Sequence, residues 1–204
     1  MTVVAGTAGY GETAEALVRQ YESLSFETVH RELLPLLPPA PVAAIDIGAG
    51  TGRDAAALAR RGYRVTAVEP TPQLRRAAQG LHADRAIRWI DDALPGLPAV
   101  AALGERFGIV LLSAVWMHLD RDERAQAMAR VAALLAPGGV MALSLRHGPA
   151  PEGRRMFAVT AAETRALAEA HGLATLHASE GAALLHGPEV RWTRLVFAAP
   201  KPAV

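Results

Sequence analysis

AIDIGAGTGRD, residues 44–54, is typical of a buried strand that runs into a glycine-rich turn and then into a helix. The glycines at positions 48, 50 and 52 allow a tight turn, and a ligand can lie against the main chain there because no Cβ stands in the way. The dinucleotide-binding pattern G-x-G-x-x-G would need its third glycine at Arg53, so the stretch does not match it. Asp46 would repel a pyrophosphate, and the turn therefore favours a cofactor with a cationic tail.

Outward from this turn, strand-like runs alternate with helical ones, a pattern that predicts an α/β fold with a mostly parallel sheet. We expect strands at 42–47, 64–69, 86–90, 107–115 and 140–145, helices at 53–61, 71–80, 120–135 and 160–171, and a terminal strand pair at 173–179 and 190–199. The first 40 residues predict two further helices, 13–24 and 26–37, followed by three prolines. We interpret residues 1–40 as an N-terminal helical cap and residues 41–204 as the domain that it covers.

The composition of the 204 residues limits the classes of function. The chain has 21 basic and 20 acidic residues, a balance that argues against a broad nucleic-acid surface. It has no Cys, which excludes disulfides, thiolate metal sites and a cysteine nucleophile. The longest apolar run, 109–117, is too short to span a membrane, and the N-terminus lacks the basic start of a secretion signal. We expect a cytoplasmic protein with no membrane partner.

Acidic residues follow the first three expected strands. Asp46 ends the first strand, and Glu69 ends the second, where a carboxylate can accept both hydroxyls of a ribose. Asp91 and Asp92 follow the third strand, where either carboxylate can accept the amino group of an adenine and the backbone N–H of Ala93 can donate to its ring. Because the carboxyl ends of parallel strands meet at one edge of a sheet, these acids should line one crevice.

These segments together resemble the class I S-adenosylmethionine-dependent methyltransferases. The resemblance covers about residues 42–145 and rests on DIGAGTG (46–52), VTAVEP (65–70), WIDDALPGLP (89–98), FGIVLLSAVWMHL (107–119) and LLAPGGVMALSL (134–145). It implies a Rossmann-like seven-stranded sheet with an antiparallel last strand, helices on both faces, and S-adenosylmethionine as the cofactor. The implied cofactor-binding residues are Asp46, Gly48, Ala49, Gly50, Gly52, Arg53, Glu69, Pro70, Asp91, Asp92, Ala93 and Ser113.

Methyl transfer from a sulfonium depends mainly on positioning, and a general base adds about a hundredfold or more when the acceptor must lose a proton. His118 and His147 follow the fourth and fifth strands and are candidate bases, with a scaffold role as the alternative for each. The candidates for contact with the substrate are Tyr21, Trp116, Met117 and Arg146. Core packing is the alternative for the first three, and a solvated loop is the alternative for Arg146. Asp54 is interpreted as a first-turn helix acid and His30 as a surface or packing residue.

Several reaction classes are excluded by what the sequence lacks. Base-flipping amino methyltransferases use an Asn/Asp-Pro-Pro-aromatic motif after the fourth strand, where this chain reads SAVW (113–116), and the chain has no Asn at all. No carboxylate cluster follows that strand to bind a catalytic metal. The sequence therefore predicts metal-independent methyl transfer to O or N of a small molecule, with no DNA partner. A catalytically silent cofactor-binding partner protein and an RNA or protein methyltransferase remain as alternatives. The oligomeric state is not predicted.

Overall fold

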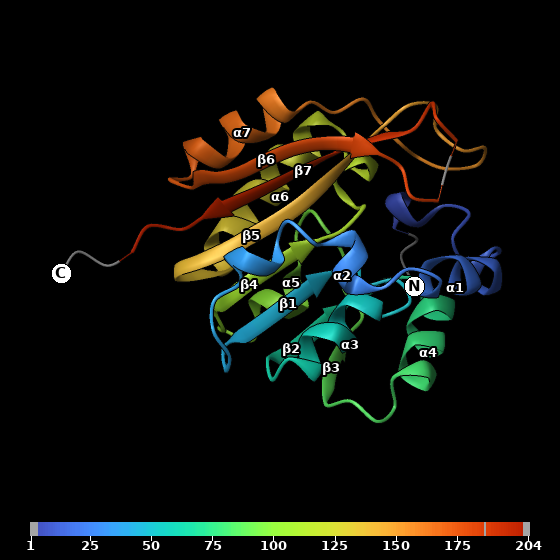
Figure 1. Ribbon diagram of the computed structural model, residues 1–204, viewed down its shortest axis with the longest axis horizontal. Helices are drawn as coiled ribbons and strands as arrows, with labels where there is room; N and C mark the ends of the chain where they lie inside the picture. The colour runs from blue at the N-terminus through green and yellow to red at the C-terminus, as the bar shows by residue number, and fades with distance from the viewer. Residues whose placement is uncertain (1–3, 186, 202–204) are drawn as a thin grey trace.

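The computed structural model of the protein describes residues 4–185 and 187–201 and contains one seven-stranded sheet (Figure 1). The strands are β1 (Ala43–Ile47), β2 (Arg64–Val68), β3 (Ile87–Ile90), β4 (Phe107–Leu112), β5 (Leu135–His147), β6 (Ala174–Ala182) and β7 (Arg191–Ala198). Their order in the sheet is β3-β2-β1-β4-β5-β7-β6, and β7 is antiparallel to both of its neighbours. The predicted fold class is thereby confirmed, including the antiparallel last strand.

Helices cover both faces of the sheet, which explains why its central strands are almost wholly apolar. They are α3 (Arg53–Arg60), α4 (Pro72–Leu81), α5 (Pro98–Ala101), α6 (Arg121–Leu134) and α7 (Ala161–Ala170). One hydrophobic core lies between the sheet and α5, α6 and α7, and a second core lies between the sheet and α2 and α3. The one-turn helix α5 was not predicted, because four residues are too few to show a helical period.

The N-terminal segment lies across the edge of the sheet where the parallel strands end (Figure 1). It contains the 3₁₀ turns Ala5–Thr7 and Leu34–Leu36 and the helices α1 (Ala14–Glu22) and α2 (Phe26–Val29). Leu17 of α1 packs against Leu74 of α4. The predicted helix at 26–37 is wrong beyond residue 29, and Pro35, which has no N–H to donate, opens a separate 3₁₀ turn. The domain boundary at residues 40 and 41 stays a prediction.

The fourth strand is shorter than predicted, since β4 ends at Leu112 and not at Val115. Ala114 adopts a left-handed φ of 58°, which turns the chain into a short 3₁₀ helix, Trp116–His118. This turn places Val115 against the glycine loop. A Cβ at Gly48 would lie 2.5 Å from Cγ2 of Val115, and Gly48 itself has a φ of +76°. Both facts require glycine at this position.

The fifth strand begins earlier than predicted, at Leu135 and not at residue 140. Leu135 pairs with Phe107, and the register then shifts before Ile109 pairs with Val140. Pro137, Gly138 and Gly139 therefore lie at an irregularity within the strand pairing and not in a separate loop. Among the described residues, no helix is both long enough and apolar enough to cross a membrane.

Candidate functional site

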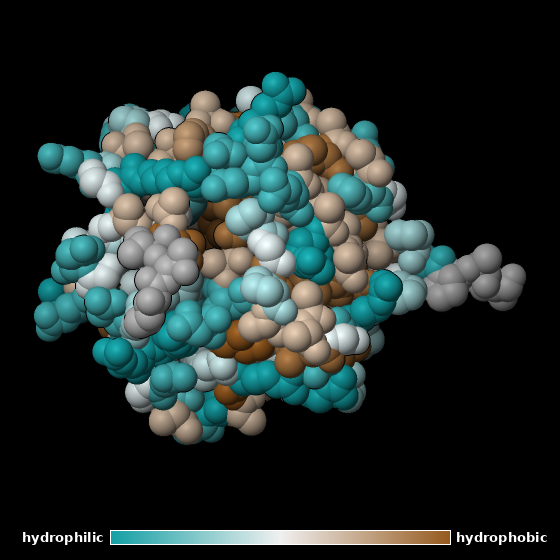
Figure 2. Space-filling view, turned by 180° about the vertical axis from the view of Figure 1, so that it is seen from behind, coloured by the Kyte–Doolittle hydropathy of each residue, from teal (hydrophilic) through white to brown (hydrophobic). Residues whose placement is uncertain are grey.

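A cavity of about 550 Å³ lies at the carboxyl ends of the parallel strands, beneath the N-terminal segment. Its lining comes from that segment, from the glycine loop after β1, and from the residues that follow β2, β3, β4 and β5. On the side of the molecule away from the C-terminus, Figure 2 shows a hollow with a hydrophobic floor and a hydrophilic rim. The cavity therefore lies at the edge where open α/β sheets bind ligands.

The glycine loop and Glu69 form one wall of the cavity. The backbone N–H of Gly50 donates to Oε2 of Glu69 at 2.8 Å, and the N–H of Thr71 donates to Oε1 at 2.7 Å. Burial raises the pKa of the Glu69 carboxyl, although these backbone donors oppose the shift. A Cβ at Gly50 would meet no atom within 4 Å, so the loop backbone is open to a ligand at this point.

Asp46 is a buried acid that lines the cavity and has one oxygen without a hydrogen-bond partner. Its side chain is 1% exposed, and Oδ2 has no hydrogen-bond partner among the described residues. Burial raises the pKa of Asp46 well above its ordinary value, and the nearby carboxylate of Asp54 raises it further. An unpaired buried carboxyl is costly, so this oxygen suits a cationic ligand group that would pair with it.

A network of charged side chains holds Asp54 beside Asp46. Nε2 of His30 lies 2.7 Å from Oδ2 of Asp54, and Nε of Arg53 donates to Oδ1 at 2.7 Å. Burial opposes ionisation here, but the charges and hydrogen bonds of His30 and Arg53 hold the pKa of Asp54 well below its ordinary value. The interpretations of Asp54 as a simple helix-dipole acid and of His30 as a surface or packing residue are therefore incomplete. Their contact joins segments 24 residues apart, and no local sequence signal announces it.

The structure distinguishes the two acids that follow β3. Asp92 lines the cavity and accepts hydrogen bonds from the N–H groups of Ala93 and Val100, each at 2.9 Å. Asp91 lies outside the lining and forms an ion pair with Arg75 at 2.7 Å on the surface. Neighbouring residues of an extended chain point to opposite sides, which explains the separation. In this structure Asp92 is the acid that lines the cavity and Asp91 lies away from it, and the role of each toward a cofactor stays a prediction.

His118 lies at the other end of the cavity in a defined protonation state. Its Nδ1 donates to the carbonyl of Arg155 at 2.8 Å, so Nε2 of the neutral ring accepts from the hydroxyl of Tyr10 at 2.9 Å. Burial lowers the pKa of His118, and the charges of Arg154, Arg155 and Arg146 lower it further. Burial also raises the pKa of Tyr10, which keeps its phenol protonated.

Tyr10 was not predicted as a site residue. It reaches His118 across 108 positions of sequence, and nothing in its local pattern indicates that contact. The guanidinium of Arg154 lies 3.7 Å from the centre of the Tyr10 ring and donates to the carbonyl of Ala8 and to Oγ1 of Thr13. The loop after β5 and the N-terminal segment are therefore joined above the cavity.

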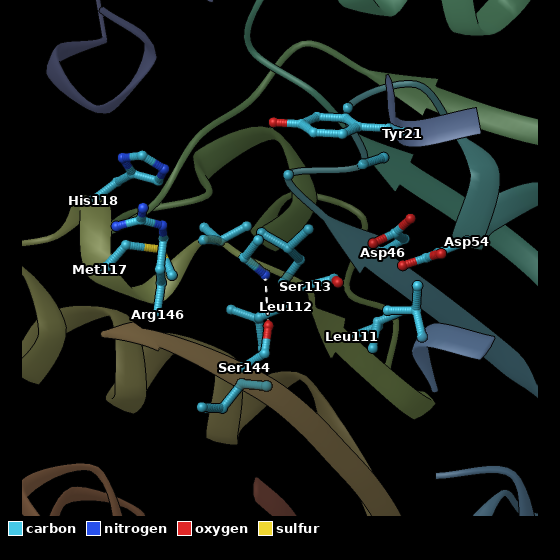
Figure 3. A pocket seen from close by; sticks show the side chains of 18 of the residues that line it. Tyr21, Asp46, Asp54, Leu111, Leu112, Ser113, Met117, His118, Ser144 and Arg146 are labelled. Carbon is cyan, nitrogen blue, oxygen red and sulfur yellow. Dashed lines mark hydrogen bonds between the residues drawn. The ribbon is translucent and has the colours of Figure 1, made fainter. Parts of the chain in front are cut away.

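Figure 3 shows how the predicted substrate contacts lie relative to the acids. Asp46 and Asp54 are on one side, and His118, Met117 and Arg146 are on the other, with Ser113 between them. Tyr21 extends its hydroxyl over the same space from α1. All of these residues line the cavity, as do Ala49, Arg53 and Pro70. Their roles toward a ligand stay predictions.

Three further predicted residues lie outside the cavity lining. Trp116 is fully buried in the core on the α6 and α7 side, because the short 3₁₀ helix turns only its neighbours Met117 and His118 toward the cavity. Trp116 is thus a core residue in this structure, and its role toward a substrate stays a prediction. His147 follows Arg146 on β5 and lies 2.8 Å from Oγ1 of Thr193, outside the cavity lining, and its role as a base stays a prediction as well. Gly52 serves packing, since a Cβ there would lie 2.7 Å from the Trp89 ring.

Within residues 4–185 and 187–201, no group of three or more His, Asp or Glu side chains is placed to hold a metal ion. The site is instead a charged and apolar cavity beside a glycine loop, with an acid at each of three neighbouring strand ends. Comparison with known proteins agrees with this arrangement, because residues 44–139 match the family model described as a methyltransferase domain.

Residues 44–139 are thus similar to a methyltransferase domain. A ubiquinone biosynthesis O-methyltransferase from Methylobacterium sp. is 36% identical over 107 residues, which are 51% of this chain and 42% of that protein. An uncharacterized methyltransferase from Mycobacterium tuberculosis is 35% identical over 121 residues, which are 55% of this chain and 58% of that protein. The chain thus spans about half the length of the curated relatives it matches.

Solved structures share the fold of this methyltransferase domain over nearly its whole length. The N-methyltransferase NodS from Bradyrhizobium japonicum, in complex with S-adenosyl-L-homocysteine, has a TM-score of 0.68 at 18% identity and covers 93% of this chain and 99% of its own. The magnesium protoporphyrin IX methyltransferase from Synechocystis, with bound S-adenosylmethionine, has a TM-score of 0.68 at 15% identity and covers 98% of this chain and 86% of its own. The Rossmann-like methyltransferase fold predicted from the sequence is confirmed.

Proposed function

We propose that the protein binds S-adenosylmethionine and transfers its methyl group, without a metal, to an oxygen or nitrogen of a small molecule. The observation that carries this proposal is the unpartnered Oδ2 of Asp46, which is buried at the cavity beside an open glycine loop. A carboxylate in that position suits the cationic part of a sulfonium amino acid and opposes a pyrophosphate. The methyltransferase relatives support the same cofactor class.

The residues present fit each part of this cofactor. Glu69 would accept the ribose hydroxyls, Asp92 with the N–H of Ala93 would hold the adenine, and Asp46 would face the cationic amino-acid part. Arg53 lines the same wall and would pair with the methionine carboxylate. When bound, the cofactor supplies an activated methyl group, so the protein has to position the acceptor and exclude water.

His118 is the proposed general base. Its Nδ1 donates a proton to the Arg155 carbonyl, so the lone pair that can accept a proton is on Nε2. His118 lines the cavity. An acceptor hydroxyl that takes the place of the Tyr10 hydroxyl meets a neutral imidazole able to remove its proton. Such a base contributes about a hundredfold or more to the rate.

A small molecule is favoured over a macromolecule because the acceptor side of the cavity is covered. Tyr10 and Arg154 close over it, and the lining is largely apolar. The cytoplasmic location and the absence of a DNA partner stay predictions from the sequence.

The proposal is tested by isothermal titration calorimetry with S-adenosylhomocysteine, with NAD as the control ligand. We expect micromolar or tighter binding of the first and none of the second. Methyl transfer is then measured as release of S-adenosylhomocysteine from a panel of phenols, carboxylic acids and amines, with EDTA present throughout. Binding without release from any acceptor would favour the silent partner, and absence of S-adenosylhomocysteine binding would refute the proposal.

A further inference from the structure

Acids and arginines line different parts of the cavity, apart from Arg53, which pairs with Asp54. The acids Asp46, Glu69 and Asp92 lie at the ends of β1, β2 and β3, while Arg146 and Arg154 lie at the end of β5 and in the loop that follows it. Figure 3 shows Asp46 and Asp54 across the cavity from Arg146. If a cofactor and an acceptor together fill the cavity, the group beside the acids should be cationic and the group beside Arg146 should be anionic.

Arg146 differs from Arg53, Arg124 and Arg155 in the kind of partner that its guanidinium has. Arg53 pairs with Asp54, Arg124 with Glu163, and Arg155 with Asp120 and Glu123. Arg146 is half-buried, and its one protein partner in the described part of the chain is the carbonyl of Pro149, which accepts from Nη1 at 2.8 Å.

No Asp or Glu oxygen within residues 4–185 and 187–201 lies within 4.0 Å of the Arg146 guanidinium. Its Nε and Nη2 donors are therefore available as a pair, which is the geometry that binds a carboxylate with two parallel hydrogen bonds. Arg154 is held in another way, because its two Nη atoms donate to Ala8 and Thr13 and its guanidinium stacks on the Tyr10 ring. The lowered pKa of His118, caused after burial by Arg154, Arg155 and Arg146, reports the same positive field.

Apolar side chains form a further part of the cavity lining. They include Leu112, Met117, Leu143, Met156 and Trp192, which we call the apolar wall. An acceptor that reaches from the methyl position to Arg146 must lie against this wall, so its body should be apolar.

We propose that the methyl acceptor is a small organic acid whose carboxylate pairs with Arg146 and whose apolar body lies against the wall between Leu112 and Trp192. This inference rests on the proposed function and adds the chemical class of the acceptor. The methyl group passes from the cofactor sulfur to an oxygen or nitrogen of the acid, the carbon–sulfur bond breaks, and the acceptor proton leaves to His118.

The test compares each acid with its uncharged amide of nearly the same shape. Benzoate and benzamide, cinnamate and cinnamide, and hexanoate and hexanamide are titrated calorimetrically into the protein saturated with S-adenosylhomocysteine, and again without it. We expect at least one acid to bind tenfold or more tightly than its amide. In R146Q this preference should disappear, while S-adenosylhomocysteine still binds and shows that the domain is folded.

The matched control is R165Q, which removes an exposed guanidinium of α7 away from the cavity and should keep the preference for acids. Amides that bind as tightly as their acids, a preference that survives in R146Q, or no binding of any acid would each overturn this inference. Those results leave the proposed function standing as long as S-adenosylhomocysteine binds. Because the titrations are also run without the nucleoside, the role of Arg146 is measured even where the proposed function fails.

Discussion

The hydroxyl of Tyr10 donates to Nε2 of His118 across 2.9 Å. Nε2 is the ring nitrogen without a proton, because Nδ1 carries the proton that is donated to the Arg155 carbonyl. The same contact fastens the N-terminal segment to the turn after β4. A base that is covered in this way stays neutral and shielded from water until an acceptor replaces the phenol.

Replacing His118 by Asn should lower the turnover number about a hundredfold while the Kd for S-adenosylhomocysteine stays the same, because only proton removal is lost. The control is H147N, which removes a sheet contact to Thr193 and should retain turnover. In the wild type, the imidazole must be neutral to act, and its pKa lies below the ordinary 6.5. Turnover should therefore fall only as the pH drops below 6.5. A loss of turnover that sets in at or above pH 6.5 on acidification, or full turnover in H118N, would show that His118 is not the base.

Glu69→Gln should weaken binding of S-adenosylhomocysteine by about 1.4 kcal/mol, or tenfold, because a neutral amide loses one acceptor oxygen and the charge that strengthens both hydroxyl contacts. Calorimetry at one salt concentration measures the change. E105Q is the control, since Glu105 is an exposed partner of Arg88 away from the cavity. Equal affinity of E69Q and wild type would contradict the assignment of Glu69 to the ribose.

Asp54→Asn should destabilise the protein by about 3 kcal/mol at pH 7, because it leaves His30 and Arg53 without their buried anion. The pKa of Asp54 is depressed in the folded protein, so its stabilisation is complete above the unfolded pKa of about 3.9 and is lost as the pH falls below it. Urea unfolding at pH 7 and at about pH 2.5 should thus show a smaller difference between D54N and wild type at the lower pH. The exposed variant D122N should match wild type at both, and a pH-independent penalty for D54N would count against this ion network.

Gly48→Ala should destabilise the protein more than Gly172→Ala does. Both glycines have nearly the same positive φ, +76° and +75°, so each substitution pays a backbone cost of about 1–2 kcal/mol. At Gly172 the new methyl group meets open space, whereas at Gly48 it meets Val115 and adds about 1–3 kcal/mol. V115A should recover this second part in the double variant. Equal effects of G48A and G172A in urea unfolding would show that the contact with Val115 is unimportant.

The sequence predicted the sheet and the acids at its edge because both depend on patterns within short stretches of the chain. Asp46 lies near the end of β1, Glu69 and Asp92 follow β2 and β3, and parallel pairing alone brings three such positions to one edge. The choice between Asp91 and Asp92 needed the structure, because it depends on which side of an extended chain each residue faces.

The remainder of the site depends on contacts between distant segments. Tyr10 meets His118, and His30 meets Asp54, through the way the N-terminal segment crosses the strand ends. The misplacement of Trp116 has a different cause. The apolar run 107–115 does not show where β4 ends, and the left-handed turn at Ala114 decides which of the next residues face the cavity.

The contact between Arg154 and Tyr10 joins two parts of the cover that are separated by most of the chain. Neither part can swing away from the cavity unless this stacked pair separates or the other part moves with it. A ligand that enters the cavity from this side therefore meets two segments that move as one for as long as the guanidinium and the phenol ring stay stacked.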